Sequence, residues 1–267
     1  MIDAIERAFH KMGARVAITS EAHRRWNGMS VGDEFLSLNV RRDSVGEYFT
    51  INNVGTELTV LDVQPKDRHL LLMSREGKEK HKFLLGHDER HWFVAGIPES
   101  KPVSNVRDAK LALKPDAVVQ AEIGIKTSKR DLHRNKARQR QGEWFFVPDR
   151  YFMAPKNWKN PVMKYEPITR GRGSKPHICQ ELYRSGGETV YVARGYDSGI
   201  TQEQYDALDK KERQSRNWQV MKRDMDVWVR GTIRHPDHAT IVLNDWCRVY
   251  SNTEHLSYAM RNIRFLD

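Results

Sequence analysis

The chain has 267 residues, with 45 Lys and Arg against 35 Asp and Glu, which gives a formal net charge of +10. Hydrophobic residues make up 39% of the chain and charged residues 30%, a composition that is typical of a folded globular protein and argues against intrinsic disorder. No apolar run approaches the roughly 18–20 residues of a membrane span, and two cysteines provide no disulfide framework. We therefore expect a cytoplasmic protein with reduced thiols and no membrane partner.

The positive charge is concentrated in the middle of the chain. Residues 101–184 contain 19 Lys and Arg but 8 Asp and Glu, whereas the segments before and after them are close to neutral. A localised excess creates a directed electrostatic field around one part of the protein, and it indicates a polyanionic partner.

The first hundred residues are expected to form one domain, a helix followed by an antiparallel β meander. Apolar spacing predicts the helix over residues 2–12, with Gly13 as its stop. Short strands at roughly ten-residue spacing, joined by tight turns, favour a curled antiparallel sheet or a small barrel. Short apolar runs between turn residues predict strands over 35–38, 48–51, 58–63, 69–73, 82–85 and 91–95.

Residues 101–267 are expected to form a second, mixed α+β part. A short helix is predicted near 106–113, with Ser104 as its N-cap, and a capping box that starts at Thr201 predicts another helix. Alternating apolar residues predict a hairpin over 227–243. The predicted fold class is therefore α+β, with a candidate nucleic-acid-binding segment over residues 126–184.

The basic segment begins with closely spaced cations and continues into loops where cations alternate with aromatic residues. If residues 129–140 are helical, Arg130 and Arg134 share one face, and Lys136 and Arg140 share another. Cations bind phosphates and aromatic rings stack on unpaired bases, so the mixture favours RNA over DNA. An acidic protein partner is the alternative for the same charges. The candidate nucleic-acid-binding residues are Lys129, Arg130, Arg134, Lys136, Arg138, Arg140, Lys156, Trp158, Arg170, Arg172 and Lys175.

Histidines occur in two predicted turns. His87 and His91 flank Asp-Glu-Arg, His235 and His238 flank Pro-Asp, and His177 lies in a basic loop. The first turn could ligate a metal or orient a general base, but its order differs from the metalloprotease His-Glu-x-x-His motif, and we predict no metal site. An exposed polar turn is the simpler interpretation of that pair. If His177 converged with one residue from each pair, the imidazoles could cleave a phosphodiester as base and acid.

Three functions remain open from the sequence. The protein is expected to bind nucleic acid, RNA rather than DNA, through its basic segment. The alternatives are a His-dependent, metal-independent nuclease and an assembly protein whose basic face meets an acidic partner chain. Neither a phosphate-binding loop, nor a dinucleotide-binding fingerprint, nor a nucleophile elbow occurs, so we predict no cofactor and disfavour nucleotide hydrolysis and dinucleotide redox chemistry.

Overall fold

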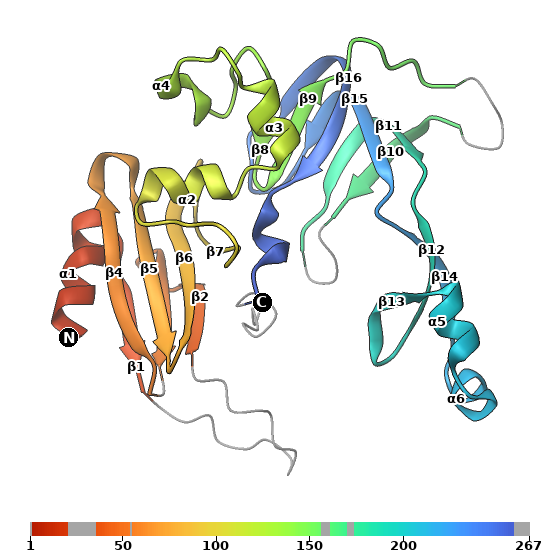
Figure 1. The fold of residues 1–267 in the computed structure, drawn as a ribbon. Helices are drawn as coiled ribbons and strands as arrows, with labels where there is room; N and C mark the ends of the chain where they lie inside the picture. Colours follow the sequence, from red (N-terminus) through yellow and green to blue (C-terminus); the bar gives the residue numbers. More distant parts are fainter. Residues whose placement is uncertain (1, 21–35, 54, 156–160, 170–173, 259–267) are drawn as a thin grey trace. The chain divides into compact units, whose positions relative to one another are not determined.

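A computed structural model describes residues 2–20, 36–53, 55–155, 161–169 and 174–258 (Figure 1). Strands predominate over helices, and the described strands form four sheets, which broadly fits the predicted α+β class. None of these sheets closes into a barrel, so the small barrel is not found among the described strands. Contacts divide the chain into two units, one of residues 1–145, 236–239 and 250–267 and one of residues 146–235 and 240–249.

The first unit begins with the predicted helix, α1 (Ile2–Met12), whose Ile5, Phe9 and Met12 are buried. A small sheet follows in which β3 (Glu47–Asn53) lies between β1 (Val16–Thr19), its parallel neighbour, and β2 (Leu36–Arg42), its antiparallel neighbour. The predicted meander is an antiparallel sheet of β4 (Glu57–Gln64), β5 (His69–Glu76), β6 (Glu79–Asp88) and β7 (His91–Ile97), with a 3-10 turn, η1 (Pro65–Asp67), between its first two strands.

Both faces of the meander are covered, which explains the continuous apolar run in β5. Alternate residues of a strand point to opposite faces. Leu70 and Leu72 therefore pack with α1, while Leu71 packs with the helix α2 (Val106–Ala112), and Figure 1 shows the two helices on either side of the sheet. The N-cap of α2 is Asn105 and not the predicted Ser104, because the Asn105 side chain accepts the hydrogen bond from the Asp108 amide.

The chain beyond α2 stays in the first unit as far as residue 145. It forms two short helices, α3 (Asp116–Ala121) and α4 (Thr127–Arg130), and then the short strand β8 (Gln139–Gln141). Helix α4 ends at Arg130, and residues 131–138 are non-helical, with an isolated β-bridge between Arg134 and Gln139. The helical faces considered for the cations of 129–140 therefore do not form.

The second unit is organised around the neighbouring strands β10-β11-β15-β16-β9, in that order. Cys179, Leu182, Val229 and Cys247 are buried in it, and both thiols are free, as expected. The hairpin predicted over 227–243 is confirmed by the antiparallel pair β15 and β16. The bounds are β9 (Trp144–Pro148), β10 (Met163–Ile168), β11 (His177–Ser185), β15 (Asp226–Arg234) and β16 (Ile241–Ser251).

A smaller three-stranded sheet and two short helices complete the second unit. The capping box is confirmed, because Thr201 and Gln204 each bond the other's backbone amide. In the described part of the chain, no helix has the length and apolar character of a membrane span. The remaining elements are β12 (Glu188–Ala193), β13 (Tyr196–Thr201), α5 (Gln202–Ala207), α6 (Lys210–Ser215), β14 (Gln219–Arg223) and η2 (Thr253–Leu256).

Candidate metal centre

Two histidines are brought together where β11 begins and β15 ends. Ile178 pairs with Arg234 in the antiparallel ladder, so His177 lies beside His235, one residue beyond the pair on each chain. Their rings stack with centroids 4.1 Å apart and planes 26° apart, and His177 is 1% exposed.

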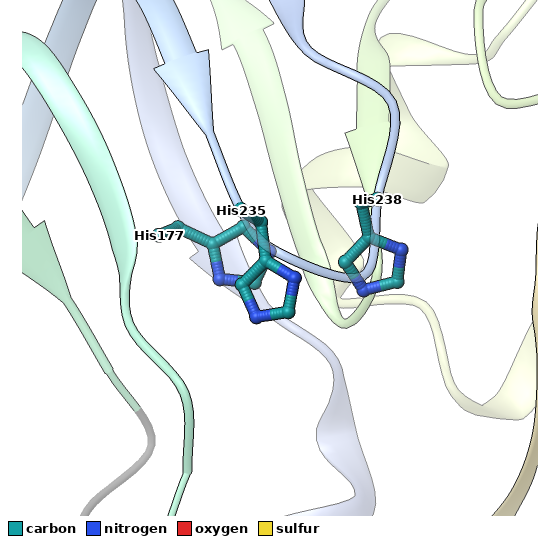
Figure 2. A group of neighbouring side chains, drawn as sticks. All are labelled: His177, His235 and His238. Atoms are coloured by element: carbon teal, nitrogen blue, oxygen red, sulfur yellow. The ribbon is translucent and has the colours of Figure 1, made fainter.

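A third histidine comes from the β15–β16 connection. His238 follows His235 by three residues, across Pro236 and Asp237. Figure 2 shows the rings of His177, His235 and His238 as neighbours, and one nitrogen from each ring lies within 4.8 Å of the other two. A tetrahedral zinc ion with bonds of about 2.0 Å holds its nitrogen ligands about 3.3 Å apart, so nitrogens as far apart as 4.8 Å would have to move closer together to bind one ion.

Two of the three rings are oriented by a neighbour on one ring nitrogen. His235 Nε2 lies 3.3 Å from the carbonyl oxygen of Lys175, and His238 Nδ1 lies 3.5 Å from Glu89 Oε2. Metal-binding histidines generally donate their second ring N–H to a carboxylate or a backbone carbonyl, which fixes the tautomer and directs the other nitrogen to the metal. The other nitrogens of these two rings are Nδ1 of His235 and Nε2 of His238.

Glu89 is a strained residue in the turn between β6 and β7. Its φ is +47°, in the left-handed region that side chains other than glycine rarely adopt, and its carboxylate accepts a hydrogen bond of 2.9 Å from the Ala239 amide. On the far side of the His238 ring lies Gly142, whose φ is +57° and where a Cβ would come within 2.7 Å of Nε2. Glu89 therefore lies near Nδ1 of His238, and Gly142 lies near Nε2.

The other two candidate histidines stay on the β6–β7 hairpin. His91 Nδ1 lies 2.6 Å from Glu47 Oε1, and His87 packs edge-on against Trp92. Burial lowers the pKa of His87. Neither residue belongs to the three-histidine group found among the described residues. The predicted convergence combined His177 with one residue from each histidine pair, whereas the observed group combines His177 with both His235 and His238 and contains neither His87 nor His91.

Sequence reasoning missed a second histidine–carboxylate contact beside the cluster. His133 Nε2 contacts Asp88 Oδ1, and Arg140 also bonds the Asp88 carboxylate. Burial raises the pKa of Asp88, but the hydrogen bond from His133 and the positive charges of Arg140, His133 and His238 outweigh it and lower this pKa to about 2. In the sequence, Asp88 and Glu89 between His87 and His91 already indicated a polar cluster. His133 was not considered, because it lies among the Lys and Arg residues of the basic segment.

Arg138, a predicted nucleic-acid-binding residue, is an interior residue. It is 2% exposed, its Nε donates to Glu122 Oε1 at 2.9 Å, and its Nη1 donates to the Leu132 carbonyl at 2.8 Å. Lys114 Nζ contacts the other oxygen of Glu122 at 2.8 Å, so this buried carboxylate faces two cations. Arg140 is likewise engaged, through Asp88. Arg138 and Arg140 therefore stabilise the loop through contacts with Glu122 and Asp88, and they are not part of an exposed basic surface.

The remaining candidate nucleic-acid-binding residues fall into three groups. Lys129, Arg134, Lys136 and Lys175 are exposed. Arg130 is partly buried, and its Nε donates to the Ile125 carbonyl at 2.8 Å. The four candidates Lys156, Trp158, Arg170 and Arg172 lie outside the described residues.

The aromatic residues beside the basic segment also divide. Tyr151 is 95% exposed and Tyr165 is 69% exposed, whereas Phe152 stacks on Trp228 with centroids 4.4 Å apart. Two of the three rings are thus accessible to an unpaired base. Comparisons of this chain with protein-family models, with curated protein sequences and with solved structures found no match.

Proposed function

We propose that the protein is a metal-dependent hydrolase of nucleic-acid phosphodiesters, in which His177, His235 and His238 hold one divalent transition-metal ion. The observation that carries the proposal is the approach of one nitrogen from each ring to within 4.8 Å of the others. Imidazole suits zinc, copper, nickel and iron, whereas magnesium and calcium prefer oxygen ligands. Zinc is the first choice because it takes nitrogen ligands in a tetrahedral arrangement.

The number of ligands supports a catalytic and not a structural ion. Structural zinc sites use four protein ligands, while catalytic sites use three and leave one position for water. A bound zinc ion lowers the pKa of that water toward neutrality and so supplies a hydroxide nucleophile. Burial raises the pKa of Cys179, two residues from His177, to about 12, so this thiol is a poor source of a fourth, thiolate ligand.

The distribution of charge and aromatic rings supports a nucleic-acid substrate. Residues 101–184 carry the whole positive excess of the chain, and Lys129, Arg134 and Lys136 are exposed within them. Exposed aromatic rings such as Tyr151 and Tyr165 stack on unpaired bases, which favours single-stranded RNA over duplex DNA.

Metal-restored cleavage tests this function. The purified protein is stripped with a chelator, dialysed, and incubated with labelled single-stranded RNA and DNA with and without added Zn²⁺. We expect RNA cleavage that requires the metal and is lost in His238→Ala. The matched control is His10→Ala, an exposed histidine of α1, which should cleave as the unchanged protein does.

Each other outcome identifies a competing function. Cleavage that persists in chelator but disappears in His238→Ala indicates a metal-independent acid–base nuclease. Salt-sensitive retention of intact RNA indicates a binding protein without this activity. Co-purification of an acidic protein, without retention of RNA, indicates an assembly protein. Any of these three results contradicts metal-dependent hydrolysis.

A further inference from the structure

The sheet formed by β11, β15 and β16 has one buried face and one face that carries aromatic and arginine side chains. Directly opposite residues of an antiparallel pair point to the same face, and successive residues of a strand alternate. Leu182 pairs with Val229, and both are fully buried. The next row is Tyr183, Trp228 and Arg248, which therefore point to the other side, the aromatic face of the sheet.

The turn of residues 149–153 is anchored on the aromatic face by Phe152. The Phe152 ring stacks on Trp228 with centroids 4.4 Å and planes 7° apart, and it meets Trp246 edge-on with centroids 5.6 Å apart. Asp149 Oδ2 accepts a hydrogen bond of 3.0 Å from Trp228 Nε1, and the Asp149 amide donates to the Trp246 carbonyl at 2.8 Å. Ring contacts and hydrogen bonds thus fix the turn to the sheet.

Tyr151 stands in the middle of this anchored turn and yet is 95% exposed. Its amide donates to Asp149 Oδ1 at 3.3 Å, and the Phe152 amide donates to the Asp149 carbonyl at 3.3 Å. Met153, on the other side of Phe152, is 85% exposed. Ordering loops and side chains costs affinity, and an aromatic ring on a fixed backbone has little left to order. The Tyr151 ring is therefore prepared to stack on a ligand.

The charge of the second unit favours a polyanionic ligand at this surface. The unit contains 18 Lys and Arg against 12 Asp and Glu, and Arg150, beside Tyr151, is exposed. The Arg230 guanidinium lies 4.9 Å from the ring centre of Trp246, and its Nε donates to Glu181 at 2.6 Å. Bases stack on aromatic rings and on guanidinium planes, and arginine also binds phosphates. This combination of groups matches a single strand, whose bases and phosphates are both accessible.

We propose that the turn of residues 149–153 binds an unpaired base of single-stranded RNA, an inference that rests on the proposed RNA substrate. The Tyr151 ring stacks on the base, Met153 packs against the same nucleotide, and Arg150 contacts its phosphate. The turn belongs to the unit that also contains His177 and His235. It therefore gives the substrate a binding site that is separate from the metal ligands and that acts without the metal.

Binding of RNA with and without its bases tests this role in the absence of cleavage. The full-length protein, kept in chelator, is titrated into labelled single-stranded RNA and into an abasic oligomer of equal length, which keeps the phosphates and the sugar hydroxyl groups. We expect the unchanged protein to prefer RNA. Tyr151→Ala should weaken RNA binding roughly 5–150-fold, the usual loss for one stacked base, and should leave binding of the abasic oligomer unchanged.

Two variants control for effects other than stacking. Tyr151→Phe keeps the ring and should bind RNA as the unchanged protein does. The matched control is Tyr258→Ala, because Tyr258 is another exposed tyrosine, at 61%, and belongs to the first unit. It should leave both affinities unchanged. The urea midpoint of Tyr151→Ala should equal that of the unchanged protein, since the ring is almost fully exposed.

The outcomes separate this inference from the proposed function. If the unchanged protein does not prefer RNA over the abasic oligomer, or if Tyr151→Ala keeps that preference, the base-binding turn is wrong, and hydrolysis is still decided by the metal-restored cleavage assay. If the preference depends on Tyr151 but no metal-dependent cleavage occurs, the turn stands and the hydrolase is wrong. Loss of a co-purifying acidic protein in Tyr151→Ala, with RNA binding unchanged, would assign the turn to a protein partner and overturn the proposal.

Discussion

The loop from Glu122 to Arg140 and the connection between β15 and β16 use their polar residues in opposite ways. In the loop, which is rich in Lys and Arg, the Arg138 guanidinium points inward to a buried carboxylate and to carbonyls. In the connection, whose formal charge is low, His235 and His238 meet His177 in a three-imidazole cluster. Formal charge in a sequence therefore does not separate a cation that braces the fold from one that meets a ligand.

The largest effect on stability is expected from Glu122→Gln. This change leaves Arg138 facing a neutral amide in a buried setting, whereas Lys114 keeps its ion pair with Asp131, and an uncompensated buried charge costs about 3–5 kcal/mol. Urea unfolding measures the loss, with Asp43→Asn as the control, because Asp43 pairs with Arg15 at the surface and should lose far less. A loss for Glu122→Gln as small as that of Asp43→Asn would mean that the loop is not braced from inside.

Asp88 predicts a pH-dependent contribution to stability. Its pKa is about 2 in the folded protein and about 3.8 ordinarily, so the ionised form stabilises the fold above about pH 4 and this stability is lost as the pH falls toward 2. The contribution at neutral pH is on the order of 2 kcal/mol. The difference in the free energy of unfolding between the unchanged protein and Asp88→Asn should shrink over that window. If this difference in unfolding free energy did not change between pH 5 and pH 2, the ion pairs of Asp88 with His133 and Arg140 would not stabilise the fold.

Glu89→Gln probes the orientation of a proposed ligand. Losing the carboxylate beside His238 Nδ1 should weaken zinc binding by roughly 10–100-fold without abolishing it, as losses of outer partners of metal ligands generally do. Competition with a chromophoric chelator measures the affinity. Glu99→Gln removes the same group from beside His81 and should leave zinc affinity unchanged. Equal affinities in all three proteins would show that Glu89 does not orient His238.

The smallest effect is expected for the exposed cations. Replacing Lys129, Arg134 and Lys136 together by Gln should lower the slope of log affinity for single-stranded RNA against log salt by up to about 2, because each phosphate contact contributes about 0.7. Replacing the exposed Lys66, Lys78 and Lys80 by Gln is the control and should leave the slope nearly unchanged. If both triple variants bind alike, the basic segment does not form the interface.

Local patterns in the sequence were sufficient to predict several elements of both units. The helix over 2–12, the meander strands and the Thr201 capping box each depend on neighbouring residues, so period and turn chemistry revealed them. The parallel pair of β1 with β3 was not foreseen, because it joins segments about thirty residues apart and no local rule specifies that partner.

The candidate site could be predicted only in part, for the same reason. His177, His235 and His238 were recognised as candidates, but their meeting depends on the register of β11 with β15, which no spacing in the chain reveals. The burial of Arg138 was not foreseen, because its partner Glu122 lies sixteen residues earlier in an apolar segment. The role of a residue cannot be inferred from its sequence neighbours when its partner lies far away in the chain.

Zinc titration of the metal-stripped protein is the most direct test of the central claim. Calorimetry should show one ion bound per chain, with the affinity reduced more than 100-fold in each of His177→Ala, His235→Ala and His238→Ala and unchanged in His10→Ala. An unchanged protein that takes up no zinc, or one whose uptake is indifferent to all three substitutions, would contradict the existence of this metal centre.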